Sequence, residues 1–273
     1  MPTALLKKRP WMAGLTALVL FLLAALALVW VFRLAIAEQV TERWCSGRGL
    51  DCQLDVERLA TSGIVINAVS VRNQAGNRPV EAGRVQLDLK WDGLFKPRLA
   101  MVRVDDPVIR LEYTPDGTVS VGGLEDLAPS GNQPSSGPMP AFDVRNARIE
   151  ALTPAGPVTM RGDVSGELPY KAKIQAEIEP ANLETDAGAL SLEEGRVDLE
   201  LAGIKLVGEA HLKLSRAEFE TLSARDITLD ARMADSFLPQ VNWTGSAASF
   251  NAPGLAAEGL DVKGSAGIVA GQL

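Results

Sequence analysis

Histidine is nearly absent from this sequence, which has one, His211, in 273 residues. The chain also has no Gly-x-Ser-x-Gly elbow, no phosphate-binding loop, and no His and Cys residues at zinc-ligand spacing. His211 falls on the polar side of an alternating segment, where a solvated strand residue is the simplest interpretation. The adjacent acids Asp105 and Asp106 point apart in an extended chain and precede a proline, which indicates a turn rather than a catalytic dyad. The sequence therefore predicts a protein that is not an enzyme, with no catalytic residue, no cofactor and no metal.

Positive charge is also scarce. The chain has 27 Lys and Arg against 34 Asp and Glu, a net charge of −7. A nucleic acid partner needs a basic stripe to hold its phosphates, and the only cationic cluster, at residues 7–9, directly precedes an apolar run. We therefore expect no nucleic acid partner.

The sequence has only two cysteines, Cys45 and Cys52, in the segment WCSGRGLDC. Gly47 and Gly49 give the intervening residues enough freedom to turn and bring the sulfurs together. We predict a disulfide, with two free buried cysteines as the alternative. A metal site is disfavoured, because two thiols do not complete a tetrahedral shell and the single histidine is far away in sequence.

One long apolar run lies near the amino end. Residues 11–32 are 22 consecutive positions without a charge, which at about 1.5 Å per residue span a bilayer core of roughly 30 Å. Lys7, Lys8 and Arg9 precede the run, and Trp11 and Trp30 lie near its ends, as in a helix with a cytoplasmic amino end. We predict a cytoplasmic end at 1–10, a transmembrane helix at 11–32 and an interfacial helix at 35–44.

A cleaved secretory signal is the alternative, because Ala35-Ile36-Ala37 has the small-x-small pattern that precedes a cleavage site. An apolar run of this length exceeds the usual core of a signal, which favours an anchor. Either interpretation exports the remainder of the chain.

A short phrase recurs along the exported part. EAGRVQLDLKW at 81–91 returns as EEGRVDLELAG at 193–203, with a third relative, SARDITLDARM, at 223–233. Apolar and polar residues alternate in each copy, and a similar alternation follows Tyr170, so each predicts a strand with one apolar side. The side chains expected on the apolar sides are Val85, Leu87, Leu89, Ile174, Ile178, Val197, Leu199, Leu201, Ile227 and Leu229.

The same alternation predicts many meandering strands. We expect them at 55–59, 64–72, 79–90, 99–105, 108–113, 142–152, 158–168, 170–179, 195–201, 206–214, 224–233, 241–250 and 260–264. A proline-rich stretch at 127–141 predicts a flexible loop between a first β segment at 45–126 and a second at 142–273. Ser215 and Glu218 have the spacing of a capping box, so a short helix and a simple turn are both open there.

These strands must cover their apolar sides. Helices are nearly absent after residue 45, and aromatic residues make up only 5% of the chain, which disfavours a helix-covered sheet and a tightly packed sandwich. We predict a mainly β fold, in which one transmembrane helix precedes a long, curled antiparallel sheet that forms an open apolar groove.

The amino-terminal part resembles a known family. Residues 59–113 contain A-x-x-V-x-L-D-L-x-W followed by L-x-x-V-x-V-x-x-P-x-I-R-L. Together with the basic end, the apolar run and the amphipathic continuation, this resembles AsmA-like envelope proteins of the YdbH type over residues 1–115. The resemblance implies an inner-membrane anchor in a Gram-negative cell and a periplasmic groove that carries phospholipids between the inner and outer membranes.

Two hypotheses on function stay open. Such proteins are usually several times longer, so we infer a fragment or a short member, incomplete at its carboxyl edge. In the first hypothesis the apolar sides line a lipid conduit, with phospholipids and the inner membrane as partners. In the second, the chain is a bitopic scaffold whose exported β domain buries the apolar sides in a dry core and docks an outer-membrane or envelope protein.

Overall fold

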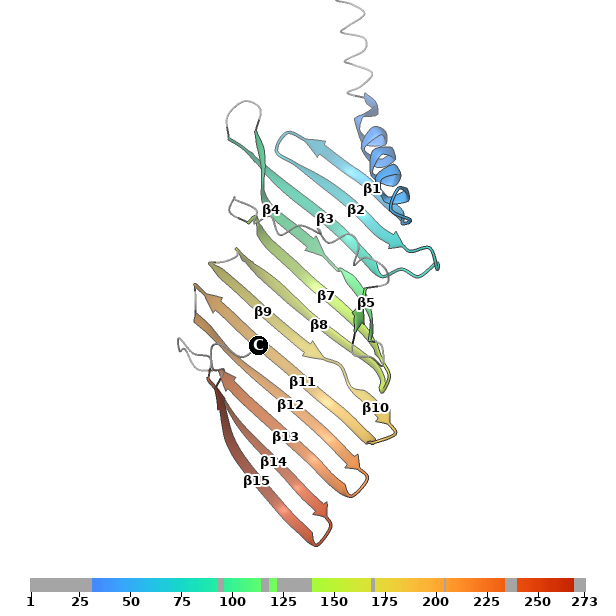
Figure 1. Cartoon of the computed structure of the whole chain (residues 1–273). Coiled ribbons are helices and arrows are strands. Elements are labelled where there is room, and N and C mark those ends of the chain that lie inside the picture. Colours follow the sequence, from blue (N-terminus) through green and yellow to red (C-terminus); the bar gives the residue numbers. More distant parts are fainter. Residues whose placement is uncertain are drawn as a thin grey trace, which may run out of the picture.

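The computed structural model describes residues 31–92, 96–113, 118–121, 139–167, 170–203, 205–233 and 240–267. One helix, residues 31–46, is followed by strands only (Figure 1). No helix in these ranges is both long and apolar enough to cross a bilayer. The transmembrane helix expected at 11–32 lies outside the described residues except for its last two.

Fifteen strands form a single sheet. In chain order they are β1 (Asp51–Ala60), β2 (Gly63–Arg72), β3 (Val80–Trp91), β4 (Pro97–Asp105), β5 (Val108–Tyr113), β6 (Val119–Ser120), β7 (Ala141–Thr153), β8 (Gly156–Glu167), β9 (Lys171–Ile178), β10 (Ala181–Thr185), β11 (Gly188–Ala202), β12 (Lys205–Phe219), β13 (Leu222–Met233), β14 (Gln240–Ala252) and β15 (Leu255–Gly267).

Strand order largely follows chain order. The path is β1-β2-β3-β4-β7-β8-β9-β11-β12-β13-β14-β15, with β5, β6 and β10 outside it. The antiparallel prediction is correct for most pairs and wrong for two, since β7 lies parallel to β4 and β5. β7 starts at the same end of the sheet as β4, which makes the pairing parallel. The expected loop at 127–141 lies outside the described residues except for its last three.

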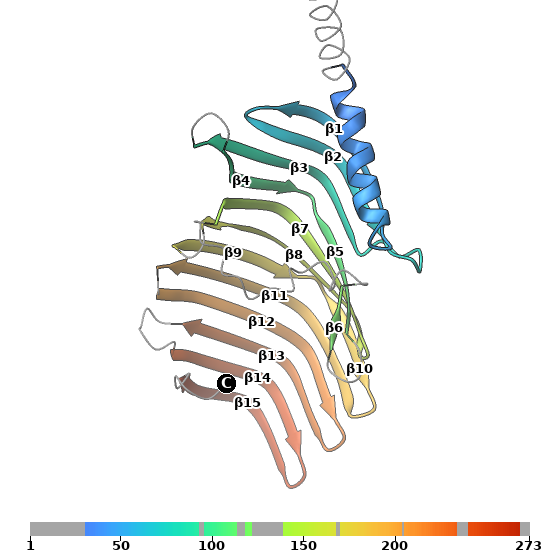
Figure 2. The same cartoon turned by 45° about the horizontal axis from the view of Figure 1, so that its top comes forward.

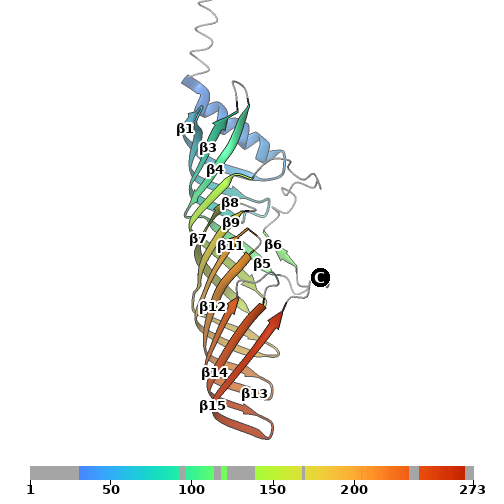
Figure 3. The same cartoon turned by 90° about the vertical axis from the view of Figure 1, so that its left-hand side faces the viewer.

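The sheet is one layer thick (Figure 3). Each described strand contacts the strands beside it in the sheet. Buried apolar side chains are correspondingly few among the described residues: Cys45, Leu50, Cys52, Val56, Val65, Ala82, Ala217 and Ala247. The sheet therefore lacks, among its described strands, the second layer that covers an apolar face in a sandwich.

The helix lies along β1, the first strand of the sheet. The Val56 backbone N–H donates a hydrogen bond of 3.0 Å to Glu38 Oε1, so a helix carboxylate accepts from the strand edge. At the helix end, Cys45 and Cys52 form a disulfide with a sulfur–sulfur distance of 2.07 Å, the pair that the sequence predicted. Their side chains pack with Leu50. An edge strand covered in this way cannot template pairing with another chain.

Strands bend part-way along their length (Figure 2). Four non-glycine residues with positive φ lie at irregular points of the strands: Ala68 (50°), Asp106 (52°), Asn146 (52°) and Asp226 (50°). The points at Ala68, Asp106 and Asn146 lie near one another in the sheet, because Arg84 lies opposite both Asn67 and Asp105, and Asp105 lies opposite Arg145. Asn146 Nδ2 also donates to Asp106 Oδ1 at 3.2 Å.

The irregular points explain several wrong boundaries. At 105–106, 145–146, 193–194 and 225–226 two consecutive polar residues interrupt the alternation, and the apolar positions then resume on the same face. Alternation alone therefore missed β10 and started β11 seven residues late. Of the two alternatives left open near Ser215 and Glu218, the short helix is wrong and the turn is correct, because β12 continues to Phe219 and a turn to β13 follows it.

Candidate functional site

Register places the apolar alternates of successive strands directly opposite one another, on what we call the apolar face. One row crosses nine strands: Ile66, Val85, Val104, Val144, Val164, Ile174, Leu199, Gly208 and Met233. A second crosses eight: Ile149, Met160, Ile178, Gly195, Leu212, Leu229, Gly245 and Val262. Side chains opposite each other in a sheet share a face, so the rows are continuous.

All ten side chains singled out from the sequence fall on these two rows or on neighbouring rows of the same face. Val85, Ile174 and Leu199 share the first row, and Ile178 and Leu229 share the second. The others occupy flanking rows of the same face: Leu87, Leu89, Val197, Leu201 and Ile227. The structure therefore brings onto one face residues up to 144 positions apart in the chain, from Val85 to Leu229.

The apolar face is not covered by another described element. Leu229 is 38% exposed, Trp243 37% and Val262 45%. Fully burying an aliphatic side chain stabilises a protein by about 1.5–3 kcal/mol relative to leaving it in water. An uncovered face of this extent is therefore expected to serve for binding apolar material.

Glycines on the apolar face are partners of large side chains that lean over them. An added Cβ would collide with Leu199 at Gly208 and with the Trp243 ring at Gly264, and would come within 2.9 Å of Leu229 at Gly245. The apolar rows thus interlock between neighbouring strands. These glycines and Trp243 were not predicted to lie on the apolar face. Their positions in the alternating segments could have indicated it.

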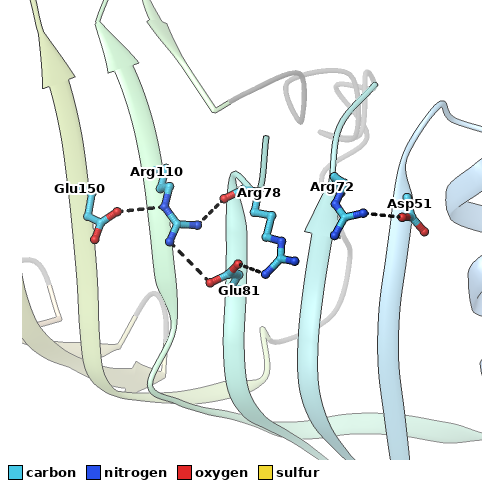
Figure 4. A network of polar contacts seen from close by, with 6 residues as sticks. All are labelled: Asp51, Arg72, Arg78, Glu81, Arg110 and Glu150. Atoms are coloured by element: carbon cyan, nitrogen blue, oxygen red, sulfur yellow. Dashed lines mark hydrogen bonds and ion pairs between the residues drawn. The ribbon is translucent and has the colours of Figure 1, made fainter. Parts of the chain in front are cut away.

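The opposite, polar face carries many ion pairs. Figure 4 shows one group, in which Arg110 contacts Glu81 at 3.6 Å and Glu150 at 2.9 Å, while Arg72 lies 3.7 Å from Asp51. Further along the sheet, hydrogen bonds from Gln175 and then from Arg196 lower the pKa of Asp198, and the same carboxylate raises the pKa of Arg196. Such exposed pairs keep this face solvated and contribute modestly to stability.

A hollow of about 680 Å³ on this face is lined mainly by charged and amide side chains, including Arg148, Asp163, Glu177 and Asp198. His211 Nδ1 lies 2.8 Å from Asp230 Oδ1 on the same face, and both side chains are well exposed. Within the described part of the chain, no three His, Cys, Asp or Glu residues are grouped so as to hold a metal ion.

The sequence was compared with known proteins and families. Searches of curated proteins and of solved structures gave no significant match. A family model described as YdbH-like, intermembrane phospholipid transport protein YdbH, matches residues 20–267. This match covers most of the chain and the whole of the described sheet, and the family is one of lipid transport and not of enzymes. The chain therefore belongs to the YdbH-like family of intermembrane phospholipid transport proteins.

Proposed function

We propose that this chain is an inner-membrane-anchored periplasmic protein whose apolar face holds the acyl chains of phospholipids as they pass between the inner and outer membranes. The bent sheet forms a groove for these chains, lined by the ten residues named from the sequence. Residues 11–32 span the inner membrane once, and the sheet lies in the periplasm.

The observation that carries this proposal is the continuity of the apolar rows. The row through Val85 and Leu199 is apolar or glycine at each of its nine positions, and no described element lies over it. Acyl chains need such a path, because a carboxylate or ammonium group in it would have to be transferred out of water at a cost of several kcal/mol.

The scaffold hypothesis predicts that the same apolar residues are buried. A dry core buries its side chains in contact with a second layer. Side chains such as Leu229 are instead partly exposed across a single layer. This favours the conduit over a scaffold that docks a secretion or outer-membrane assembly partner.

Photocrosslinking tests the proposal with the full chain in intact cells. Crosslinking residues placed at Leu87, Leu199 and Leu229 should capture phospholipid, identified by mass spectrometry after purification. The matched positions are their sequence neighbours on the polar face, Gln86, Asp198 and Thr228, which should capture none. Equal capture from both sets, or no capture from either, would favour the scaffold.

A further inference from the structure

Cationic side chains gather at one rim of the sheet, where β3 ends and β4, β9 and β12 begin. We call this the basic rim, and it consists of Lys90, Lys96, Arg98, Lys171, Lys173 and Lys205. Five of the seven lysines between residues 90 and 267 belong to it, and all six side chains are exposed. This concentration occurs in a chain with a net charge of −7, so it does not follow from composition.

Sheet register brings these cations together although the sequence separates them. Lys90 of β3 lies directly opposite Arg98 of β4. Lys171 of β9 and Lys205 of β12 both lie opposite Ala202 of the intervening β11, so the two lysines are two strands, about 10 Å, apart. Carboxylates also lie at this rim, since Asp92 is 3.8 Å from Arg98 and Glu167 lies opposite Lys171, so the rim carries an excess of positive charge rather than cations alone.

The opposite rim has the opposite character in its carboxyl-terminal half. Asp186 lies in the β10–β11 turn and Glu220 in the β12–β13 turn, and both are exposed. Glu184 and Glu218 flank these turns, and Glu218 forms an ion pair with Arg216. A molecule lying along the strands thus meets an excess of cations at one end and an excess of carboxylates at the other.

Two exposed aromatic side chains accompany the basic rim. Trp91 is 45% exposed and Tyr170 is 62% exposed, and both lie within one residue of a rim lysine. Trp91 is fixed by its indole N–H, which donates a hydrogen bond of 2.6 Å to the Thr61 carbonyl oxygen. Side chains with an apolar ring and a polar tip are enriched at the headgroup level of membranes, often beside lysines.

The rim adjoins the apolar face directly. Leu89 precedes Lys90, Ala172 follows Lys171, and Leu206 follows Lys205. Successive residues advance by about 3.3 Å along a strand, and a lysine at a strand end can turn its ammonium past the edge while its stem stays against apolar groups. Acyl chains on the apolar rows therefore leave a polar headgroup within reach of the rim.

We propose that the basic rim binds the phosphate of glycerophospholipids whose acyl chains lie on the apolar face. The proposal rests on the proposed function, because it needs acyl chains on that face. It orients every bound lipid alike, with its headgroup at the rim of Lys90, Lys171 and Lys205.

The test compares two lipids with identical acyl chains. Full-length chain purified in detergent is incubated with mixed micelles that hold equal amounts of dioleoyl phosphatidylglycerol and dioleoylglycerol, which lacks the phosphate, and the bound lipids are quantified by mass spectrometry. The wild-type chain should enrich phosphatidylglycerol. Because one cation near an anionic lipid contributes roughly a factor of five, Lys90→Gln/Lys171→Gln/Lys205→Gln should reduce the enrichment at least severalfold and leave dioleoylglycerol binding unchanged.

A matched variant removes three cations elsewhere, Lys213→Gln/Lys263→Gln/Arg225→Gln, and should keep the enrichment. An unchanged preference in the rim variant, or an equal loss in the matched variant, overturns the basic rim as a phosphate site while leaving the apolar face intact. Binding of glycerol 3-phosphate alone as tightly as phosphatidylglycerol would also overturn it, since the site would then serve a free phosphate ester. If the wild-type chain binds neither lipid, the proposed function itself fails.

Discussion

Leu199 of β11 lies directly opposite Ile174 of β9 on one side and opposite Gly208 of β12 on the other. Its side chain leans over the glycine, where an added Cβ would collide with it. Leu199 is therefore the seventh of the nine residues of the first apolar row, and it packs over the glycine of the next strand.

Replacing Leu199 with Asp should abolish lipid capture at this row, because the carboxylate would lie in the acyl path at a cost of several kcal/mol. Phospholipid that co-purifies with the full chain, quantified by mass spectrometry, should fall at least tenfold. Thr228→Asp introduces the same group on the polar face beside Lys213 and should leave bound lipid unchanged. Similar lipid loss in both variants would contradict the assignment of the two faces.

Gly162 of β8 should not accept a larger residue. A Cβ there would collide with the backbone of Gln175 and Ala176 in β9, which cannot move without breaking the ladder. We expect Gly162→Ala to destabilise the sheet by about 1–3 kcal/mol, as overpacking does, measured by denaturant unfolding. Gly267→Ala meets no atom within 4 Å and should unfold like the wild type.

The bend at Asp226 should depend on its backbone conformation. Asp226 has φ of 50°, which costs roughly 1–2 kcal/mol for residues with a Cβ and more for β-branched ones. Asp226→Gly should therefore unfold at the same or a higher denaturant concentration, and Asp226→Val at a lower one. If the two variants unfold alike, the left-handed conformation does not limit stability at this position.

The disulfide predicts a simple labelling result. Cys45 and Cys52 are bonded in the structure and export carries both beyond the reducing cytoplasm in the proposed topology. Under denaturing, non-reducing conditions neither cysteine should react with a maleimide, and both should react after reduction. Quantitative labelling without reduction would show that the bond does not form in the cell.

Acid should weaken the polar face at Asp198. Its pKa is lowered by the hydrogen bond from Gln175 and then by Arg196, so its contribution is present above the unfolded carboxyl pKa, about 3.9, and is lost as the pH falls through the folded value. Asp198→Asn should therefore melt at a lower temperature than the wild type at pH 7. The gap between the two melting temperatures should close as the pH falls below about 4.

Most of the sheet follows from alternation, and its failures have a common physical cause. Segments such as 171–178 were predicted because period-2 alternation specifies both the strand and its apolar side. At Asn146, Glu193 and Asp226 an additional polar residue interrupts the alternation, but the apolar side chains beyond it return to the same face. A prediction from simple alternation therefore ends the strand too early.

Strand order depends on contacts that no local pattern records. The parallel pairing of Val104 with Val144 joins segments across a long connection, and alternation is the same for either direction. The ten apolar residues could be predicted from the sequence because the alternation within each strand is enough to identify its apolar side. The basic rim could not be predicted from the sequence, because only the strand order and register place Lys90, Lys171 and Lys205 at the same rim of the sheet.

The interruption of the alternation within each bent strand affects how such a sheet can change in length. Because each strand regains its apolar side after the bend, a hairpin such as β12–β13 carries a complete cross-section of the apolar face. Duplicating one hairpin would extend the path by two strands, about 10 Å, and preserve chain direction and face. Duplicating a single strand would reverse every later strand and move its rim to the other side. From β11 to β15, where every pair is antiparallel, the sheet can thus grow or shrink in steps of two strands.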